Sequence, residues 1–228
     1  MTHPKIFCAV DTNDINVAIQ TAQSIEGLCG IKLGLEFFNA HGVKGVKDVM
    51  KSVGEVPLFL DLKYHDIPNT VAGAIRAVTY RLKPAYINVH ATGGLDMMKA
   101  AKDACPPETK LLAVTVLTSI DADTLDSVGQ GNDPKSQVER LAKLAKDAGC
   151  DGVVCSSHEI ETIRNACGND FITMVPGIRP AGSDAGDQKR IMTPKEAIDK
   201  GATHLVIGRP ITQADSPAQM ARDIIETL

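Results

Sequence analysis

Residues 58–71 read Leu-Phe-Leu-Asp-Leu-Lys-Tyr-His-Asp-Ile-Pro-Asn-Thr-Val, and this stretch indicates the fold of the chain. An apolar run of strand character ends in alternating charges. Because side chains along a strand alternate between its two faces, Asp61 and Lys63 are expected to project to the same side. Asp66 follows just after the strand should end. Pro68 has a fixed φ and no N–H, so it suits the first turn of a helix, and the stretch predicts a strand, a charged loop and a helix start.

The same succession of an apolar run and an amphipathic segment recurs along the whole chain. Eight strands are expected, at residues 5–10, 31–34, 58–63, 85–90, 111–117, 152–155, 171–175 and 205–207. A helix is expected after each strand. The first ends near residue 25, the next four span 43–53, 68–82, 95–104 and 135–148, and the sixth ends near 166. The seventh spans 194–200, and the last starts at 216. Near-continuous apolar strands that alternate with helices indicate a parallel sheet covered by helices. Eight units in 228 residues favour an α/β fold, a single-domain (β/α)8 TIM barrel over residues 1–228, rather than an open doubly wound sheet.

Composition excludes several classes of function. The formal net charge is −4, the pI is about 5.9 and the chain contains no Trp, so nucleic-acid binding is not expected. No apolar run approaches the ~20 residues that cross a bilayer, so no membrane partner is expected. The N-terminus lacks the apolar segment of a signal peptide, and the expected location is cytoplasmic.

The cysteines and histidines show no pattern of metal ligands. The six cysteines are scattered without a C-x-x-C pair, and most of them lie in or beside apolar segments, as small core residues do. The six histidines show no H-E-x-x-H or other ligand spacing, so the sequence predicts no metal site.

Polar residues end nearly every expected strand. In a (β/α)8 barrel the active site lies at the carboxyl ends of the strands, so these residues should meet at one mouth. They are Asp11, Lys32, Asp61 with Lys63, His90, Thr118, Ser156, Gly177 with Arg179, and Gly208 with Arg209. The sequence therefore predicts a functional site at this mouth.

The loops after the seventh and eighth strands are where barrels commonly bind phosphate. They read Pro-Gly-Ile-Arg at 176–179 and Gly-Arg-Pro at 208–210. Glycine lets backbone amides approach an anion, and an arginine binds phosphate oxygens through its planar fork. The polar segment 181–190 is of the kind that folds over a ligand as a lid, with Gln188 as its tip contact.

A group of alternating charges forms the other part of the expected site. Its members are Lys32, Asp61, Lys63 and Asp66. Unit charges about 4 Å apart interact by ~4 kcal/mol at an effective dielectric constant of ~20, so a packed array would remain ionised. A lysine fixed in such an array can stabilise developing negative charge and then donate a proton, which suits a carbanion-like intermediate.

The segment 61–71, Asp-Leu-Lys-Tyr-His-Asp-Ile-Pro-Asn-Thr-Val, resembles the signature of the orotidine 5′-monophosphate decarboxylase family. The resemblance extends from Ala-Val-Asp at 9–11 through Gly-Ile-Lys-Leu-Gly at 30–34 and Val-Thr-Val-Leu-Thr-Ser at 114–119. It continues through Val-Pro-Gly-Ile-Arg-Pro at 175–180 to Ile-Gly-Arg-Pro at 207–210. It implies conversion of orotidine 5′-monophosphate to UMP without a metal or organic cofactor.

The resemblance also implies a role for each matched residue. Lys63 would protonate C6 of a carbanion-like intermediate, and Asp61 would lie beside the departing carboxylate. Lys32 and Asp11 would hold ribose hydroxyls and order the charges, and Thr118 would contact the pyrimidine. The implied phosphate ligands are Gln188, Arg179, and Gly208 with Arg209.

Two further residues would serve the neighbouring subunit. Asp66 and Thr70 would reach into the partner's site, which makes a homodimer with shared active sites part of the implied mechanism. His65 lies opposite in phase to Asp66, and His90 ends the fourth strand without a motif partner, so a hydrogen-bonded structural role is expected for both.

Two alternatives remain open on the sequence. Sugar-phosphate barrel enzymes such as 3-keto-L-gulonate 6-phosphate decarboxylase and hexulose phosphate synthase resemble this family in their Asp-x-Lys-x-x-Asp strand, but use Mg²⁺ and an enediolate. The segments 67–71 and 176–179 favour the nucleotide enzyme. The other alternative is a catalytically silent nucleotide-binding barrel, against which the intact charged group argues.

Overall fold

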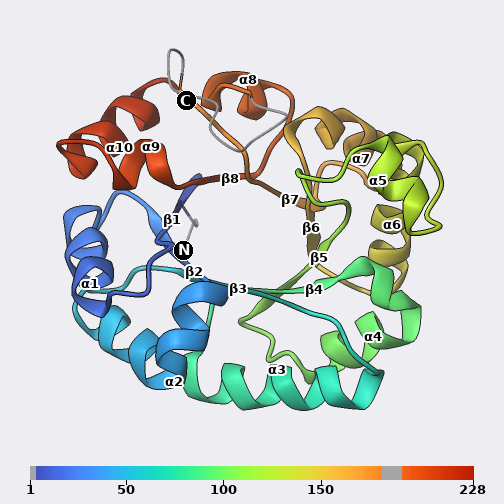
Figure 1. The fold of residues 1–228 in the computed structure, drawn as a ribbon, viewed down its shortest axis with the longest axis horizontal. Coiled ribbons are helices and arrows are strands. Elements are labelled where there is room, and N and C mark those ends of the chain that lie inside the picture. The colour runs from blue at the N-terminus through green and yellow to red at the C-terminus, as the bar shows by residue number, and fades with distance from the viewer. Residues whose placement is uncertain (1–3, 181–191) are drawn as a thin grey trace.

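The protein is a closed barrel of parallel strands surrounded by helices, as the computed structural model shows for residues 4–180 and 192–228 (Figure 1). Each strand pairs with its neighbours in chain order, and β1 pairs with β8 to close the sheet. The strands are β1 Ile6–Ala9, β2 Gly30–Gly34, β3 Leu58–Tyr64, β4 Tyr86–His90, β5 Lys110–Val114, β6 Gly152–Val154, β7 Ile172–Val175 and β8 His204–Ile207. The predicted (β/α)8 TIM barrel is confirmed.

The helices form a ring around the barrel (Figure 1). They are α1 Ile15–Ser24, α2 Leu35–Lys51, α3 Pro68–Leu82, α4 Gly94–Ala104, α5 Ala122–Ser127, α6 Pro134–Asp147, α7 Ile160–Cys167, α8 Pro194–Asp199, α9 Arg209–Thr212 and α10 Pro217–Glu226, with the short 3-10 helices η1 Ala91–Gly93 and η2 Ser157–Glu159. Within the described residues, no helix has the length and apolar character needed to cross a membrane.

Local sequence signals set several helix starts. The side chain of Asp14 accepts hydrogen bonds from two backbone amides at the start of α1, and Asp133 accepts one at the start of α6. Pro68 occupies the first position of α3, as predicted. Thr193 and Glu196 form a reciprocal capping box at the start of α8.

Two apolar layers stabilise the barrel. Phe7, Phe59 and Tyr86 belong to the cluster inside the barrel, where the rings of Phe7 and Tyr86 meet edge to face with centroids 5.3 Å apart. Neighbouring residues on the same strands, such as Ile6 and Ile87, belong to the larger cluster between the sheet and the helices. Strand alternation thus fills both layers, because each strand is buried on both faces.

The structure corrects the expected elements in four places. Helix α2 begins at Leu35, directly after β2, and not near residue 43, and a break at Gly42 divides it where the backbone has φ of 58°. Such a φ favours glycine. The expected loop after the fifth strand contains α5, which Asp121 caps, and the expected loop after β8 contains α9. The fifth strand ends at Val114 and not at residue 117, so the chain that follows is free to reach the mouth of the barrel.

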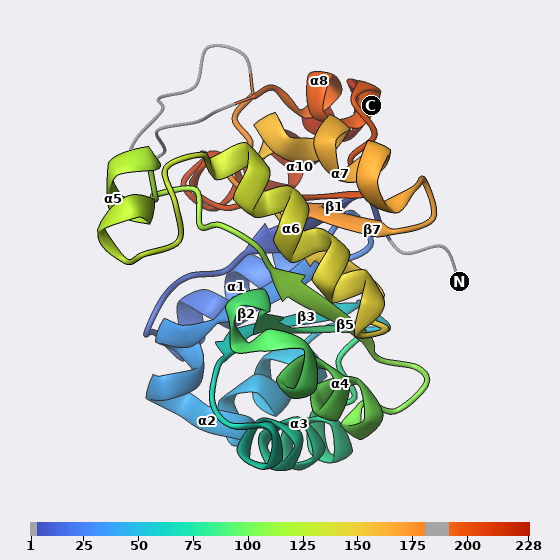
Figure 2. The ribbon, with the colours of Figure 1, turned by 90° about the vertical axis from the view of Figure 1, so that its right-hand side faces the viewer.

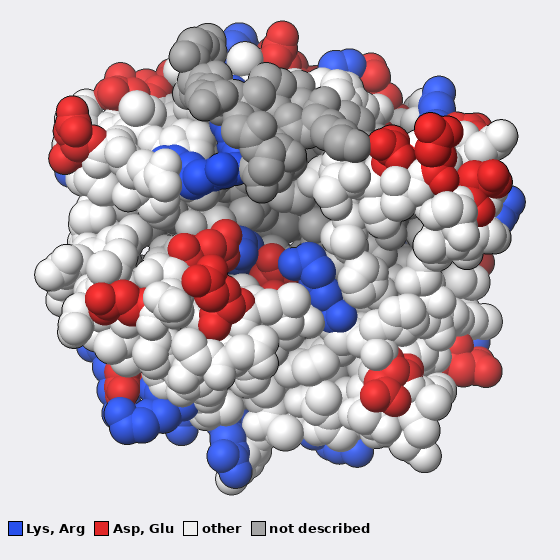
Figure 3. Space-filling view, viewed as in Figure 1, with Lys and Arg blue, Asp and Glu red and all other residues white. Residues whose placement is uncertain are grey.

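The two ends of the barrel differ in what covers them. Helix α5, in the connection that follows β5, projects from the face where the strands end, and the N-terminal end of the described chain lies toward the opposite face (Figure 2). The face at the strand ends is the one that Figures 1 and 3 present to the viewer.

Candidate active site

A cavity of about 590 Å³ opens at the carboxyl ends of the barrel strands. This volume lies within the range of small-molecule sites. Figure 3 shows acidic and basic side chains around the hollow at the centre of this face. The charged residues that line the cavity are Asp11, Lys32, Glu36, Asp61, Lys63, Arg179 and Arg209. Its floor is apolar and includes Phe59, Val114 and Val206.

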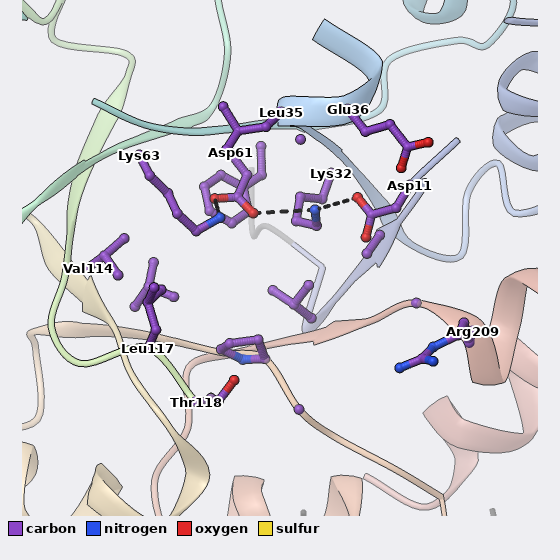
Figure 4. Close-up of a pocket in the computed structure, with 18 of the residues that line it drawn as sticks. Asp11, Lys32, Leu35, Glu36, Asp61, Lys63, Val114, Leu117, Thr118 and Arg209 are labelled. Carbon is purple, nitrogen blue, oxygen red and sulfur yellow. Dashed lines mark hydrogen bonds and ion pairs between the residues drawn. The ribbon is translucent and has the colours of Figure 1, made fainter. Parts of the chain in front are cut away.

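Four charged side chains, from β2, β3 and the segment that follows β1, form a continuous chain of alternating sign (Figure 4). The Lys32 ammonium lies 2.9 Å from Asp11 Oδ1 and 3.3 Å from Asp61 Oδ2. The Lys63 ammonium lies 2.7 Å from the other oxygen of Asp61. The Lys63 side chain is 26 % exposed, so its ammonium is accessible from the cavity.

Burial and neighbouring charges have opposite effects on the pKa values of Lys32 and Asp61, and the effect of the charges is the larger. Burial alone would lower the pKa of Lys32, but the carboxylates of Asp61 and Asp11 raise it above its usual value. Burial alone would raise the pKa of Asp61, but the ammonium groups of Lys32 and Lys63 and the amide of Asn88 hold it below its usual value. Both groups are therefore charged at neutral pH.

Strand β3 is irregular at the point where it presents Asp61 and Lys63. Its pairing with β4 matches Leu60 to Ile87 and then Tyr64 to Val89, so more residues lie on β3 than on β4 between these pairs. Lys63 has φ of 49°, a left-handed conformation that costs a residue with a side chain about 1–3 kcal/mol. The predicted approach of Asp61 and Lys63 is present, but it arises in a bulge and not in regular alternation.

Asn88, on β4, was not identified from the sequence. Its Nδ2 donates to Asp61 Oδ1 at 2.7 Å, and its Oδ1 accepts from the backbone amide of Lys63 at 2.8 Å. The signal that could have identified it is a lone amide side chain between the apolar residues Ile87 and Val89 of an expected barrel strand.

The direct passage from β2 into α2 shapes the wall beside the charged chain. A Cβ on Gly34 would lie 3.1 Å from the Lys32 ammonium and 3.3 Å from Asp11 Oδ1, so a side chain there would crowd their contact. Leu35 and Glu36 follow at once and line the cavity, which the expected later start of this helix did not anticipate.

The expected phosphate residues lie across the cavity from the charged chain. Arg209, at the start of α9, is exposed and lies on the opposite side of the cavity from Lys63 (Figure 4). Gly208 and Arg179 also line the cavity, although Arg179 is buried and donates to the carbonyl of Ile178 at 2.9 Å. Thr118 lines the cavity from the connection after β5. Gln188 and the expected lid lie outside the described residues.

Asp66 and Thr70 do not line the cavity of their own chain. Both are exposed, and Asp66 Oδ1 accepts from the backbone amide of Ile67 at 2.6 Å. Ile67 itself is 67 % exposed. The row of charges in this structure therefore contains Asp11 as its second carboxylate, and not Asp66.

Two of the polar strand-end residues also lie away from the cavity. Ser156 is buried and caps η2 by accepting from the backbone amide of His158. His90 packs against His65, with ring centroids 5.7 Å apart. Burial, His65 and Lys63 lower the pKa of His90, and Asp61 opposes this effect. The hydrogen-bonded structural role expected for both histidines stays a prediction.

The described residues contain no group of three or more His, Cys, Asp or Glu side chains arranged to hold a metal ion. The cavity carboxylates Asp11 and Asp61 instead accept from lysine ammonium groups. Lysine is thus the cation that these oxygens bind in the structure.

The sequence model of the orotidine 5′-phosphate decarboxylase / HUMPS family matches residues 4–224. An orotidine 5′-phosphate decarboxylase of Rhodospirillum rubrum is 52 % identical over 231 residues, covering 97 % of this chain and 93 % of the relative. That of Novosphingobium aromaticivorans is 50 % identical over the full length of both chains. The crystal structure of orotidine 5′-phosphate decarboxylase from Lactobacillus acidophilus superposes with a TM-score of 0.84 at 37 % identity, covering 99 % of this chain and 98 % of that one.

Proposed function

The chain belongs to the orotidine 5′-phosphate decarboxylase / HUMPS family, and we propose that it works without a cofactor and that Lys63 protonates the carbanion-like intermediate. Its relatives at about half identity along the whole chain are decarboxylases. The chain is accordingly a carboxy-lyase that converts orotidine 5′-monophosphate to UMP in pyrimidine nucleotide biosynthesis.

The observation that carries the proposed mechanism is the chain of charges from Asp11 to Lys63. In the proposed step the bond between C6 and the carboxylate carbon breaks and CO₂ leaves. The electron pair that remains on C6 takes a proton from the Lys63 ammonium, and the neutral amine regains a proton from water. Asp61 holds the ammonium at 2.7 Å before the reaction, so the proton donor needs little reorganisation as charge develops.

The binding roles follow from where the remaining side chains lie. Lys32 and Asp11 form the part of the charged chain nearest Glu36 and are proposed to hold the ribose hydroxyls (Figure 4). Thr118 is proposed to contact the pyrimidine. The proposed phosphate ligands are Arg209, Gly208, Arg179 and Gln188, the last of them outside the described residues.

The donor set of the cavity does not fit the Mg²⁺ site of the sugar-phosphate enzymes. Mg²⁺ needs carboxylate oxygens that are available to it. Both oxygens of Asp61 and one of Asp11 accept from lysine ammonium groups, and a divalent cation among them would be repelled by Lys32 and Lys63. This arrangement supports a mechanism without a metal.

A turnover assay tests the function and its independence of metal together. The purified protein should convert orotidine 5′-monophosphate to UMP at the same rate before and after treatment with EDTA, because lysines perform the electrostatic role. Absorbance of the pyrimidine ring reports the reaction. A rate that falls with EDTA and returns with Mg²⁺ would contradict cofactor independence, and no turnover at all would indicate a silent nucleotide-binding barrel.

Arg209→Ala tests the phosphate end of the site. Losing a charge-assisted hydrogen bond costs about 1.5–3 kcal/mol, so KM for the nucleotide should rise roughly 10- to 150-fold. Any residual turnover of orotidine, which has no phosphate, should hardly change. The matched control is Arg222→Ala, which removes an exposed arginine of α10 outside the cavity. Equal losses on nucleotide and nucleoside would show that Arg209 is not a phosphate ligand.

A homodimer with shared sites is part of the proposal. It is supported by Asp66 and Thr70, which are exposed beside the cavity-forming strand without lining the cavity of their own chain. The exposed apolar side chain of Ile67 lies between them in sequence and suits a covered surface. Asp66 and Thr70 are proposed to complete the partner subunit's site.

Two broader assignments also remain proposals. We propose that residues 1–228 form one domain, which is supported by the pairing of β1 with β8 from the two ends of the chain. The cytoplasmic location also stays a prediction.

A further inference from the structure

Asn88 is a polar residue in a mostly apolar interior. It lies at the middle of β4, on the same face as Tyr86, which belongs to the cluster inside the barrel. The flanking residues Ile87 and Val89 pack toward the helices. Asn88 is 0 % exposed and does not line the cavity, so it is not placed to touch a substrate. A buried amide without hydrogen bonds would be costly, and its partners therefore indicate its role.

Both partners of the Asn88 amide belong to the charged strand end of β3. Asn88 donates to Asp61 Oδ1 at 2.7 Å and accepts from the Lys63 backbone amide at 2.8 Å. The same Asp61 oxygen accepts from the Lys63 ammonium at 2.7 Å. One side chain thus contacts the carboxylate and the backbone of the residue whose ammonium that carboxylate holds.

This contact coincides with the irregular part of β3. Between the pairs Leu60 with Ile87 and Tyr64 with Val89, the regular backbone ladder is interrupted. The Asn88 side chain supplies a partner for the Lys63 amide where the ladder does not. Lys63 has its left-handed φ of 49° at this point, a conformation that persists only when its surroundings hold it.

We propose that Asn88 is a positioning residue that fixes the Asp61 carboxylate and the Lys63 backbone relative to each other, and thereby aims the Lys63 ammonium into the cavity. This inference rests on the proposed role of Lys63 as proton donor. Asn88 acts on the chemical step and not on binding, because its contacts are with Asp61 and Lys63 and none is with the expected phosphate or ribose ligands.

Asn88→Ala tests the positioning role through the separation of kcat from KM. Loss of an outer contact that orients a reacting group typically costs 10–100-fold in activity, so kcat should fall by about that factor. KM should stay within about threefold of the wild-type value, because the nucleotide-binding end is unchanged. A kcat within about twofold of wild type in a folded Asn88→Ala protein, or equal effects on kcat and KM, would overturn the proposal.

Thr109→Val is the matched control for the loss of a buried hydrogen bond. Thr109 is 1 % exposed, and its hydroxyl donates to the carbonyl of Pro84 at 2.8 Å. Both residues lie where β4 and β5 begin, at the end of the barrel away from the cavity. Thr109→Val should lower thermal stability and leave kcat unchanged. If it lowered kcat as much as Asn88→Ala, the effect of Asn88 would be one of general stability.

Asn88→Asp provides a readout that depends on pH. A protonated Asp at position 88 can donate to Asp61 and accept from the Lys63 amide, as the asparagine does, whereas the ionised form faces Asp61 with like charge. The charged and titratable groups that bond to or flank this position come from four places. They are Tyr86 and His90 on β4 itself, Asp61 and Lys63 on β3, Lys32 on β2, and His65 in the loop after β3. The ratio of the variant's kcat to that of wild type should therefore fall as pH rises from about 5 to about 9. A ratio that stays flat over this range would overturn the proposal.

A measurement without substrate separates this inference from the proposed function. The difference in melting temperature between wild type and Asn88→Asp should widen as pH rises, because the new carboxyl ionises beside Asp61. This result is independent of any turnover. An inactive wild-type protein would contradict the proposed function alone, whereas a melting-temperature difference independent of pH would contradict the placement of Asn88 against Asp61.

Discussion

Lys63→Ala should lower kcat for orotidine 5′-monophosphate by at least the ~10²–10⁴-fold that a positioned general acid contributes. The loss should exceed this range, because the substitution also removes a positive charge that Asp61 and the developing carbanion both use. The Lys63 ammonium lies 2.7 Å from Asp61, on the cavity side of the charged chain. Binding of UMP should weaken much less, because the expected phosphate ligand Arg209 lies across the cavity (Figure 4).

Steady-state kinetics and the Kd for UMP separate these two effects. The matched control is Lys44→Ala, which removes a lysine that also pairs with an aspartate, at 2.6 Å from Asp48, but is 88 % exposed on α2. Exposed pairs of this kind contribute about 0–1 kcal/mol to stability, so the control should keep its full activity. Near-normal turnover by a folded Lys63→Ala protein would remove Lys63 from the mechanism.

Asp66→Ala should be nearly as inactive as Lys63→Ala, and a mixture of the two inactive proteins should regain activity. If Asp66 serves the neighbouring subunit's site, each heterodimer has one site with both substitutions and one site with neither. Random exchange makes half of the dimers heterodimers, each with one intact site of two. The re-associated mixture should therefore approach about a quarter of wild-type activity.

The structure supplies a strict control for this mixing experiment. Lys32 and Lys63 both contact Asp61 and line the cavity of the same chain. A mixture of Lys32→Ala and Lys63→Ala should therefore regain nothing, because each site of the heterodimer still lacks one lysine. If verified heterodimers of Asp66→Ala and Lys63→Ala are equally inactive, Asp66 acts within its own chain and the shared-site proposal is wrong.

The charged chain shows where interpretation of the sequence reaches its limit. The two-residue spacing of Asp61 and Lys63 predicted that they would be close, and they are in contact. Their contact with Lys32 depends on strand register, because β2 pairs with β3 so that Gly34 lies opposite Asp61. The inclusion of Asp11 depends in the same way on the pairing of Ala9 with Lys32. The sequence grouped Asp66 with these charges, but Asp66 does not line the cavity of its own chain.

The sequence also could not show which of the polar residues at the strand ends line the cavity. Thr118 and Arg209 line the cavity as expected, but His90 and Ser156 do not. A polar residue at a strand end can point into the mouth, pack on a neighbouring loop or cap a short helix, and sequence alone does not distinguish these outcomes. Asn88 was missed for the opposite reason. It lies within a strand and not at its end, yet it contacts both Asp61 and Lys63.

The sequence by itself determined the barrel, its family and the residue types at the carboxyl ends of its strands. These features follow from local patterns, namely apolar runs, helix caps and short motifs, whose physical causes act within a few residues. Only the tertiary structure decided which of those side chains meet. Contacts such as Asn88 with Asp61 join residues 27 positions apart. Their existence depends on how neighbouring strands are registered, where β3 departs from regular pairing and how the sheet closes, and these are properties of the whole barrel.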